Sequence, residues 1–281
     1  MKWAINFISI FFILGFVNAQ IPDPVNNFRA FSPFNDLVPS GSDPTTTLLN
    51  DAELWIMASD VDTPSDGSSV TTLTAHGSSL YTFTEATNKP IYKASIINGQ
   101  PVIRFDGTND KMECSSGFLP KTLFAVVKPI ALGNWLSWYG CKSTTAGAWD
   151  SYLLGNSLAT TTASWRVGYG TGSSNVTAIS TGVLSNGTPV LYMVTLDTSG
   201  GNINTTIKID GTAGSPGSVS SQTVKTADGP QIIGAGYYND AVVDFANYDV
   251  AEIIGWDRAL DGTEEGLAQT YLADKYNITV P

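Results

Sequence analysis

The sequence has little positive charge, because 14 Lys and Arg stand against 25 Asp and Glu and the formal net charge is −11. Nucleic acids and anionic membrane surfaces are bound mainly through clusters of Lys and Arg. The chain contains no basic stretch that opposes its acidic balance, so we expect neither as a partner. There is also only one His, His76, which lies in a Gly/Ser turn without a motif that would make it catalytic.

Long apolar runs are absent after the first residues of the chain. Lys2, the apolar stretch over residues 4–17 and the small residue Ala19 together form the pattern of a signal peptide over residues 1–19. No later stretch reaches the roughly 20 uninterrupted apolar residues that a membrane helix needs. We therefore expect a secreted protein, located outside the cell or at the cell surface, without membrane insertion.

Cysteine is nearly absent, with Cys114 and Cys141 as the only two. In an exported protein such a pair is more often joined than reduced, and we predict a disulfide worth about 3 kcal/mol on the chain-entropy model. Two buried thiols are the alternative. A zinc site is not expected, because zinc usually takes three or four protein ligands.

Proline is concentrated near the start of the chain. Residues 20–50 contain five Pro between Asn and Ser residues, which predicts an extended lead-in or linker. From residue 51 to residue 281 we expect one domain built of short apolar and alternating segments separated by Gly-rich turns. Two of the Asp-Gly pairs, at Asp106 and Asp210, are typical of hairpin turns.

The C-terminal part of the chain combines a strand with a helix. The apolar run Val250–Trp256 predicts a strand buried on both faces. Asp261 has the side chain of an N-cap, and Glu264 follows three residues later, which is the pattern of a capping box. The fold class that we predict is all-β, a two-sheet antiparallel jelly-roll sandwich with one short C-terminal helix.

Five blocks of sequence carry a resemblance to a known group: LWIMASD, INGQPVIRFDGTNDKMEC, TLFAVVKP, VAEIIGWDRAL and YLADKYNI. Together they resemble the laminin-G-like branch of the concanavalin A-like lectin/glucanase group. The resemblance implies a jelly-roll whose concave sheet meets carbohydrate, sometimes with calcium at the rim. Met57 stands where bacterial members often have an acidic residue, and Asp249 lacks the usual preceding Gly. The fold hosts lectins, adhesion modules, glycosidases and lyases alike.

Catalytic motifs are missing. Glycosidases of this fold use carboxylates in the pattern E-x-D-x-x-E, which the chain lacks. Simple alternation places Asp249 and Glu252 on opposite faces of a strand, so Glu252 is interpreted as a structural carboxylate that caps a turn or pairs with Arg258. Segments near Tyr237 only loosely resemble those of alginate lyases. An enzyme, if the chain is one, would be a polysaccharide lyase or glycoside hydrolase.

Oxygen-rich turns make calcium a possible cofactor. The cluster Asp240, Asp244, Asn247 and Asp249 carries the hard ligands that calcium prefers. Asp106, Asn109 and Asp110 form a second such turn. Asp and Asn also favour turns without any metal, and that reading stays open for both clusters.

A zone rich in aromatic residues is the best candidate for ligand binding, because indole and phenol rings stack on the C–H faces of sugars. Alternation predicts that Trp138 lies in the core and that Trp135 is open. The predicted ligand-binding residues are Trp149, Trp135, Tyr152, Trp165 and Tyr169.

The sequence therefore favours a secreted glycan-binding, lectin-like or adhesion module without catalytic activity, whose partner is a carbohydrate or cell-surface glycan. One alternative is a subunit of an extracellular fibre or sheath that self-assembles through the N-terminal extension. The other is a lyase or hydrolase with an unrecognised site.

Overall fold

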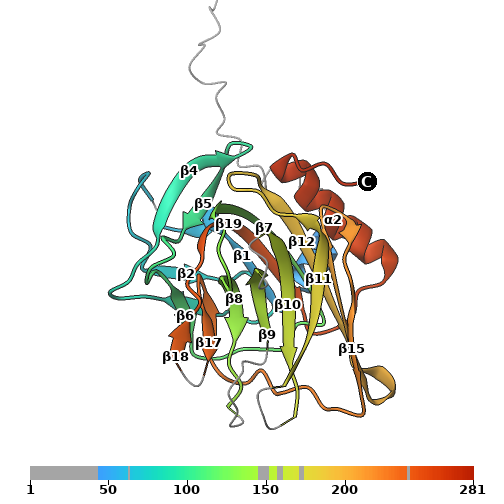
Figure 1. Ribbon diagram of the computed structural model, residues 1–281. Helices are drawn as coiled ribbons and strands as arrows, with labels where there is room; N and C mark the ends of the chain where they lie inside the picture. Colours follow the sequence, from blue (N-terminus) through green and yellow to red (C-terminus); the bar gives the residue numbers. More distant parts are fainter. Residues whose placement is uncertain (1–43, 63, 145–151, 157–160, 171–173, 239–240) are drawn as a thin grey trace, which may run out of the picture. The chain divides into compact units, whose positions relative to one another are not determined.

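The computed structural model describes residues 44–62, 64–144, 152–156, 161–170, 174–238 and 241–281. All of them belong to one compact unit, Ser42–Pro281. Two large antiparallel sheets face each other in a β-sandwich (Figure 1), which confirms the predicted fold class. The predicted signal peptide lies outside the described residues.

The first sheet, sheet A, has nine strands. Seven follow the order β14-β13-β12-β7-β19-β5-β4, while β1 pairs with β19 and β15 pairs with β13. The strands are β1 (Leu54–Met57), β4 (Ile91–Ile97), β5 (Gln100–Arg104), β7 (Thr122–Ala131), β12 (Val190–Asp197), β13 (Asn202–Ile209), β14 (Thr212–Ala213), β15 (Gly217–Ser220) and β19 (Asn247–Trp256).

The second sheet, sheet B, has eight strands in the order β11-β10-β9-β8-β16-β6-β3-β2. A separate hairpin of β17 (Gly236–Tyr238) and β18 (Ala241–Val243) follows β16. Tyr237 of the hairpin is buried with Ile232 of sheet B. The strands of sheet B are β2 (Thr72–Thr74), β3 (Thr82–Thr84), β6 (Met112–Cys114), β8 (Ser137–Cys141), β9 (Tyr152–Asn156), β10 (Thr162–Gly168), β11 (Asn175–Val183) and β16 (Gln231–Ile233).

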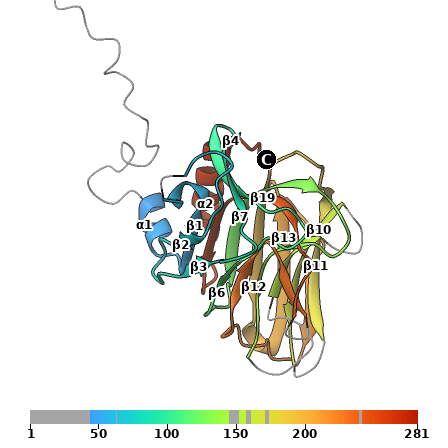
Figure 2. The same ribbon diagram turned by 90° about the vertical axis from the view of Figure 1, so that its left-hand side faces the viewer.

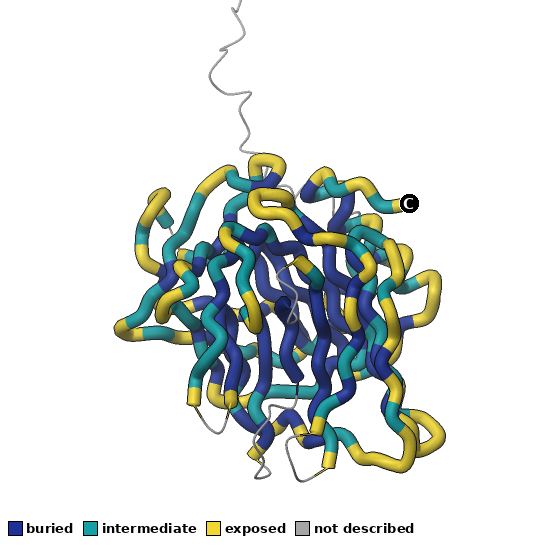
Figure 3. Tube along the Cα trace, in the orientation of Figure 1, coloured by how far each residue is buried: buried dark blue, intermediate teal, exposed yellow. Residues whose placement is uncertain are grey.

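The main core lies between the two sheets, where alternate residues of facing strands meet (Figure 3). Trp138 of β8 is fully buried, as predicted, and its ring meets that of Tyr192 of β12 edge to face at a centroid distance of 5.1 Å. The central strand β7 is apolar on both faces because its second face is covered as well. Phe124 of that second face meets Trp256 of β19.

The helix α2 (Gly262–Tyr276) lies on the side of sheet A that faces away from sheet B (Figure 2). Its capping box forms as predicted. The Asp261 carboxylate accepts hydrogen bonds from the backbone N–H groups of Thr263 and Glu264, and Glu264 accepts one from the backbone N–H of Asp261. Among the described residues, no helix is both long and apolar enough to cross a membrane.

The predicted role of Glu252, which was to cap a turn or pair with Arg258, was wrong. A register shift between Val250 and Glu252 marks a β-bulge in β19, and the inserted residue reverses the alternation that follows it. Asp249 and Glu252 therefore oppose Lys128 and Val126 of β7, which lie on the same face. Glu252 points under α2 and pairs with Lys275 instead of Arg258.

The lead-in expected over residues 20–50 ends in a helix rather than in extended chain. The helix α1 (Pro44–Asn50) starts with Pro at its first position, where the missing N–H costs nothing. It packs against α2, and the carbonyl of Leu48 accepts a hydrogen bond of 3.2 Å from the indole N–H of Trp256. The folded domain thus begins before residue 51.

The Asp106-Gly107 turn was wrongly predicted to form a hairpin, because it leads from β5 of sheet A to β6 of sheet B. The hairpin of this region joins β4 to β5 through Asn98 and Gly99, which have φ of 48° and 76°. Two consecutive positive φ values match a type I′ turn. Two short 3-10 helices, η1 (Ala58–Asp60) and η2 (Ser199–Gly201), complete the described elements.

Candidate functional site

Trp135 is the most exposed Trp side chain that the structure describes, with 36% of its surface accessible. It lies in the connection from β7 to β8, and its φ of 57° is in the left-handed region, where a bulky residue is uncommon. The next residue, Leu136, accepts a hydrogen bond of 2.8 Å from the backbone N–H of Asn156. A Cβ on Gly155 would lie 1.8 Å from the Leu136 oxygen, so only Gly permits this close approach.

Arg166 fixes the position of the Trp135 ring. Trp165 of the same strand, β10, points into the core, so the next side chain, Arg166, points to the outer face of sheet B. Its guanidinium carbon lies 4.9 Å from the centroid of the Trp135 ring. Cation–π contacts of this kind contribute about 0.5–2 kcal/mol. Arg166 is only 6% exposed, so the ring packs against a largely buried cation.

A carboxylate lies near this pair. The backbone carbonyl of Asp244 accepts a hydrogen bond of 2.8 Å from the N–H of Ser137, which ties the segment after β18 to the start of β8. Burial raises the pKa of the Asp244 carboxyl, and the positive charge of Arg166 acts in the opposite direction. The outer face of sheet B thus presents an exposed indole beside a cation and a carboxyl group, a combination that suits stacking and hydrogen bonding to a polar ring.

The other predicted aromatic residues that the structure describes are not brought to this face. Tyr152 and Trp165 are fully buried, so their prediction as ligand-binding residues was wrong; strand alternation turns both into the core. Tyr169 is partly buried, and it packs against the core. Trp149 lies outside the described residues. The sequence analysis missed Arg166, which the alternation of β10 could have indicated once Trp165 was assigned to the core.

The residues predicted to bind calcium are only partly comparable with the structure, because Asp240 lies outside the described residues. Both carboxylate oxygens of Asp249 accept hydrogen bonds from Arg104, at 2.7 and 2.9 Å. Asp244 precedes β19, and Asn247 is the first residue of that strand. Within the described part of the chain, no group of three or more His, Cys, Asp or Glu side chains is arranged to hold a metal ion. Calcium stays a prediction.

The predicted disulfide was wrong, because Cys114 and Cys141 are separate buried thiols. Gln231 of β16 pairs with Cys114 of β6 on one side and with Cys141 of β8 on the other. The two cysteines are therefore two strand spacings apart, roughly 9.5 Å. A disulfide needs Cα atoms within about 7 Å of each other.

Comparisons with known proteins identify the architecture. No protein-family model matches the sequence, and no curated protein matches it. The binding domain of paraclostridial mosquitocidal protein 1 aligns with a TM-score of 0.53 and 13% identity over 82% of this chain and 53% of that chain. The binding domain of botulinum neurotoxin DC, solved in complex with SialylT, aligns with a TM-score of 0.54 and 10% identity over 80% of this chain and 52% of that chain.

What these proteins share is the fold. At such low identity the likeness extends no further than the β-sandwich, and this chain spans about half the length of either toxin domain structure. Neither of the two structures is named for the laminin-G-like branch, so that resemblance stays a prediction.

Proposed function

We propose that this chain is an exported carbohydrate-binding module, lectin-like rather than catalytic, and that Trp135 is its stacking platform. The observation that carries the proposal is the conformation of Trp135. A residue in the left-handed region costs about 1–3 kcal/mol, and such strain concentrates at binding sites. Here the surrounding structure imposes the strain on an indole that remains 36% exposed.

Sugar rings match this surface chemically. Their C–H faces stack on an indole, while their hydroxyl groups bind to nearby charged side chains. Asp244 supplies such a charge near the ring, whereas Arg166 is buried against the ring and supports it. The botulinum neurotoxin domain of the same fold was solved in complex with SialylT, which is in keeping with a binding role. The leader pattern of residues 1–19 supports export.

The test is a glycan array with the wild-type protein, Trp135→Ala and Leu80→Ala. Leu80 is 75% exposed and lies between β2 and β3, so its variant is a matched control for the loss of an exposed apolar side chain. We expect Trp135→Ala to weaken glycan binding at least about tenfold and Leu80→Ala to leave it unchanged. Unchanged binding by Trp135→Ala would remove the platform from the proposal, and an array without any bound glycan would reject carbohydrate binding altogether.

A further inference from the structure

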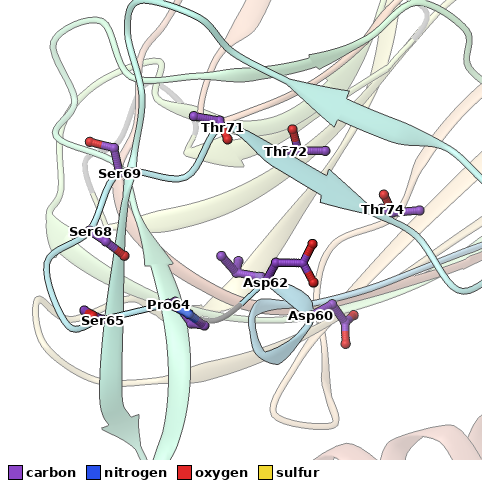
Figure 4. Close-up of a pocket in the computed structure, with 10 residues that line it drawn as sticks. Asp60, Asp62, Pro64, Ser65, Ser68, Ser69, Thr71, Thr72 and Thr74 are labelled. Carbon is purple, nitrogen blue, oxygen red and sulfur yellow. The ribbon is translucent and has the colours of Figure 1, made fainter.

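A pocket of about 380 Å³ lies beside β2, the strand at one edge of sheet B (Figure 4). This volume is within the range of about 300–1,000 Å³ that is typical of small-molecule sites. Two carboxylates, Asp60 and Asp62, contribute to its lining. Six residues that carry hydroxyl groups line it as well: Ser65, Ser68, Ser69, Thr71, Thr72 and Thr74.

The walls of the pocket are held by the neighbouring sheets. Asp66 follows the lining residue Ser65, and its carboxylate accepts hydrogen bonds from the Lys93 ammonium, at 2.6 Å, and from the backbone N–H of Ala94, at 2.9 Å. The backbone of Ser68 accepts a hydrogen bond of 2.8 Å from the N–H of Tyr92. Because one wall is β2, paired with β3, the cavity is formed before any ligand binds.

Asp60 is held in a fixed orientation. One of its oxygens accepts a hydrogen bond of 3.1 Å from the backbone N–H of Met57, and the other lies 3.0 Å from Nε2 of His76. The His76 ring in turn lies 5.9 Å from the ring of Trp55. A carboxylate fixed in this way is a preorganised acceptor for hydroxyl groups.

The remaining polar groups of the pocket are available to a ligand. Within the described residues, neither the six hydroxyl groups nor the Asp62 carboxylate forms a hydrogen bond or ion pair with another group of the protein. None of the described lining residues is Lys or Arg, so the local field disfavours an anion. Hydroxyl groups that both donate and accept, together with carboxylate acceptors, match a ligand that is rich in hydroxyl groups.

We infer that this pocket is a second binding site, which takes an uncharged, hydroxyl-rich ligand such as one unit of a neutral sugar. The site is separate from Trp135. In sheet B, β2 is separated from β8 by β3, β6 and β16, so four strand spacings, roughly 19 Å, lie between them. Two sites on one chain allow a polysaccharide to be held at two points, which raises avidity without any new contact.

The experiment follows backbone amide signals by NMR while the full chain is titrated with glucose, galactose and mannose as neutral probes and with glucuronate as the anionic probe. We expect a neutral sugar to shift the signals of residues 65–74, and glucuronate to shift them less at the same concentration. Thr74→Val and Asp62→Asn each remove one ligand contact and should weaken binding by roughly threefold to tenfold.

Thr82→Val is the matched control, because Thr82 is the exposed cross-strand partner of Thr74 outside the pocket lining. It should leave the affinity unchanged, and so should Trp135→Ala. Glucuronate binding as tightly as the neutral sugars, or no neutral sugar shifting residues 65–74, would overturn the inference. Shifts confined to the surroundings of Trp135 would overturn it while leaving the proposed function intact.

Discussion

Lys275 and Glu252 form a buried ion pair that ties α2 to sheet A, and its removal should destabilise the protein strongly. Glu252 is fully buried and the Lys275 side chain is only 10% exposed, with Nζ 2.8 Å from a Glu252 oxygen. The same carboxylate accepts hydrogen bonds from Trp55, Tyr271 and Tyr276, at 2.7, 3.0 and 2.8 Å. Burial and the charge of Glu252 raise the pKa of Tyr276.

The perturbation is Lys275→Met, which keeps a long side chain but removes the positive charge. The three remaining donors are neutral, so the buried carboxylate loses its compensating charge, and breaking a buried pair in this way costs about 3–5 kcal/mol. Glu252→Gln leaves the ammonium of Lys275 without its carboxylate and should cost a similar amount. The double variant removes both charges and leaves no buried charge uncompensated, so we expect it to be more stable than either single variant.

The assay is equilibrium unfolding in urea of the wild type, both single variants and the double variant. Independent side chains would give additive losses. Additive losses, or single-variant losses below about 1 kcal/mol, would contradict the view that this pair joins the helix to the sheet. Lys208→Met is a suitable control, because its partner Glu265 is partly exposed and exposed pairs contribute only about 0–1 kcal/mol.

Three further predictions concern Trp135, Asp110 and the two cysteines. Trp135→Gly should be more stable to urea than Trp135→Ala by about 1 kcal/mol, because Gly adopts positive φ without strain; the reverse order would refute the left-handed backbone. Burial and the charge of Asp106 raise the pKa of Asp110 to about 6, from 3.8. The folded protein therefore retains a proton that the unfolded chain releases, so stability falls as the pH rises from about 4 to about 6, and Asp110→Asn should flatten this fall in urea midpoints. Cys114 and Cys141 should react with a thiol reagent only after unfolding, whereas a protein lighter by two hydrogens in mass spectrometry would indicate a disulfide.

The sequence by itself determined the features that depend on neighbouring residues. The alternating apolar segments specify a two-sheet sandwich, and the Asp261 and Glu264 pair specifies the start of the last helix. Burial of Trp138 follows from alternation within its own short strand. These signals are local because the periodicity of a strand and the first turn of a helix each span only a few residues.

Only the tertiary structure decided which distant segments meet. A single inserted residue in β19 turned Glu252 toward α2, and Gln231 came to lie between two cysteines that the sequence suggested joining. Arg166 reached Trp135 only because β10 lies two strands from β8. Strand order and register arise from packing over the whole domain, since one shifted residue reverses the face of every side chain after it.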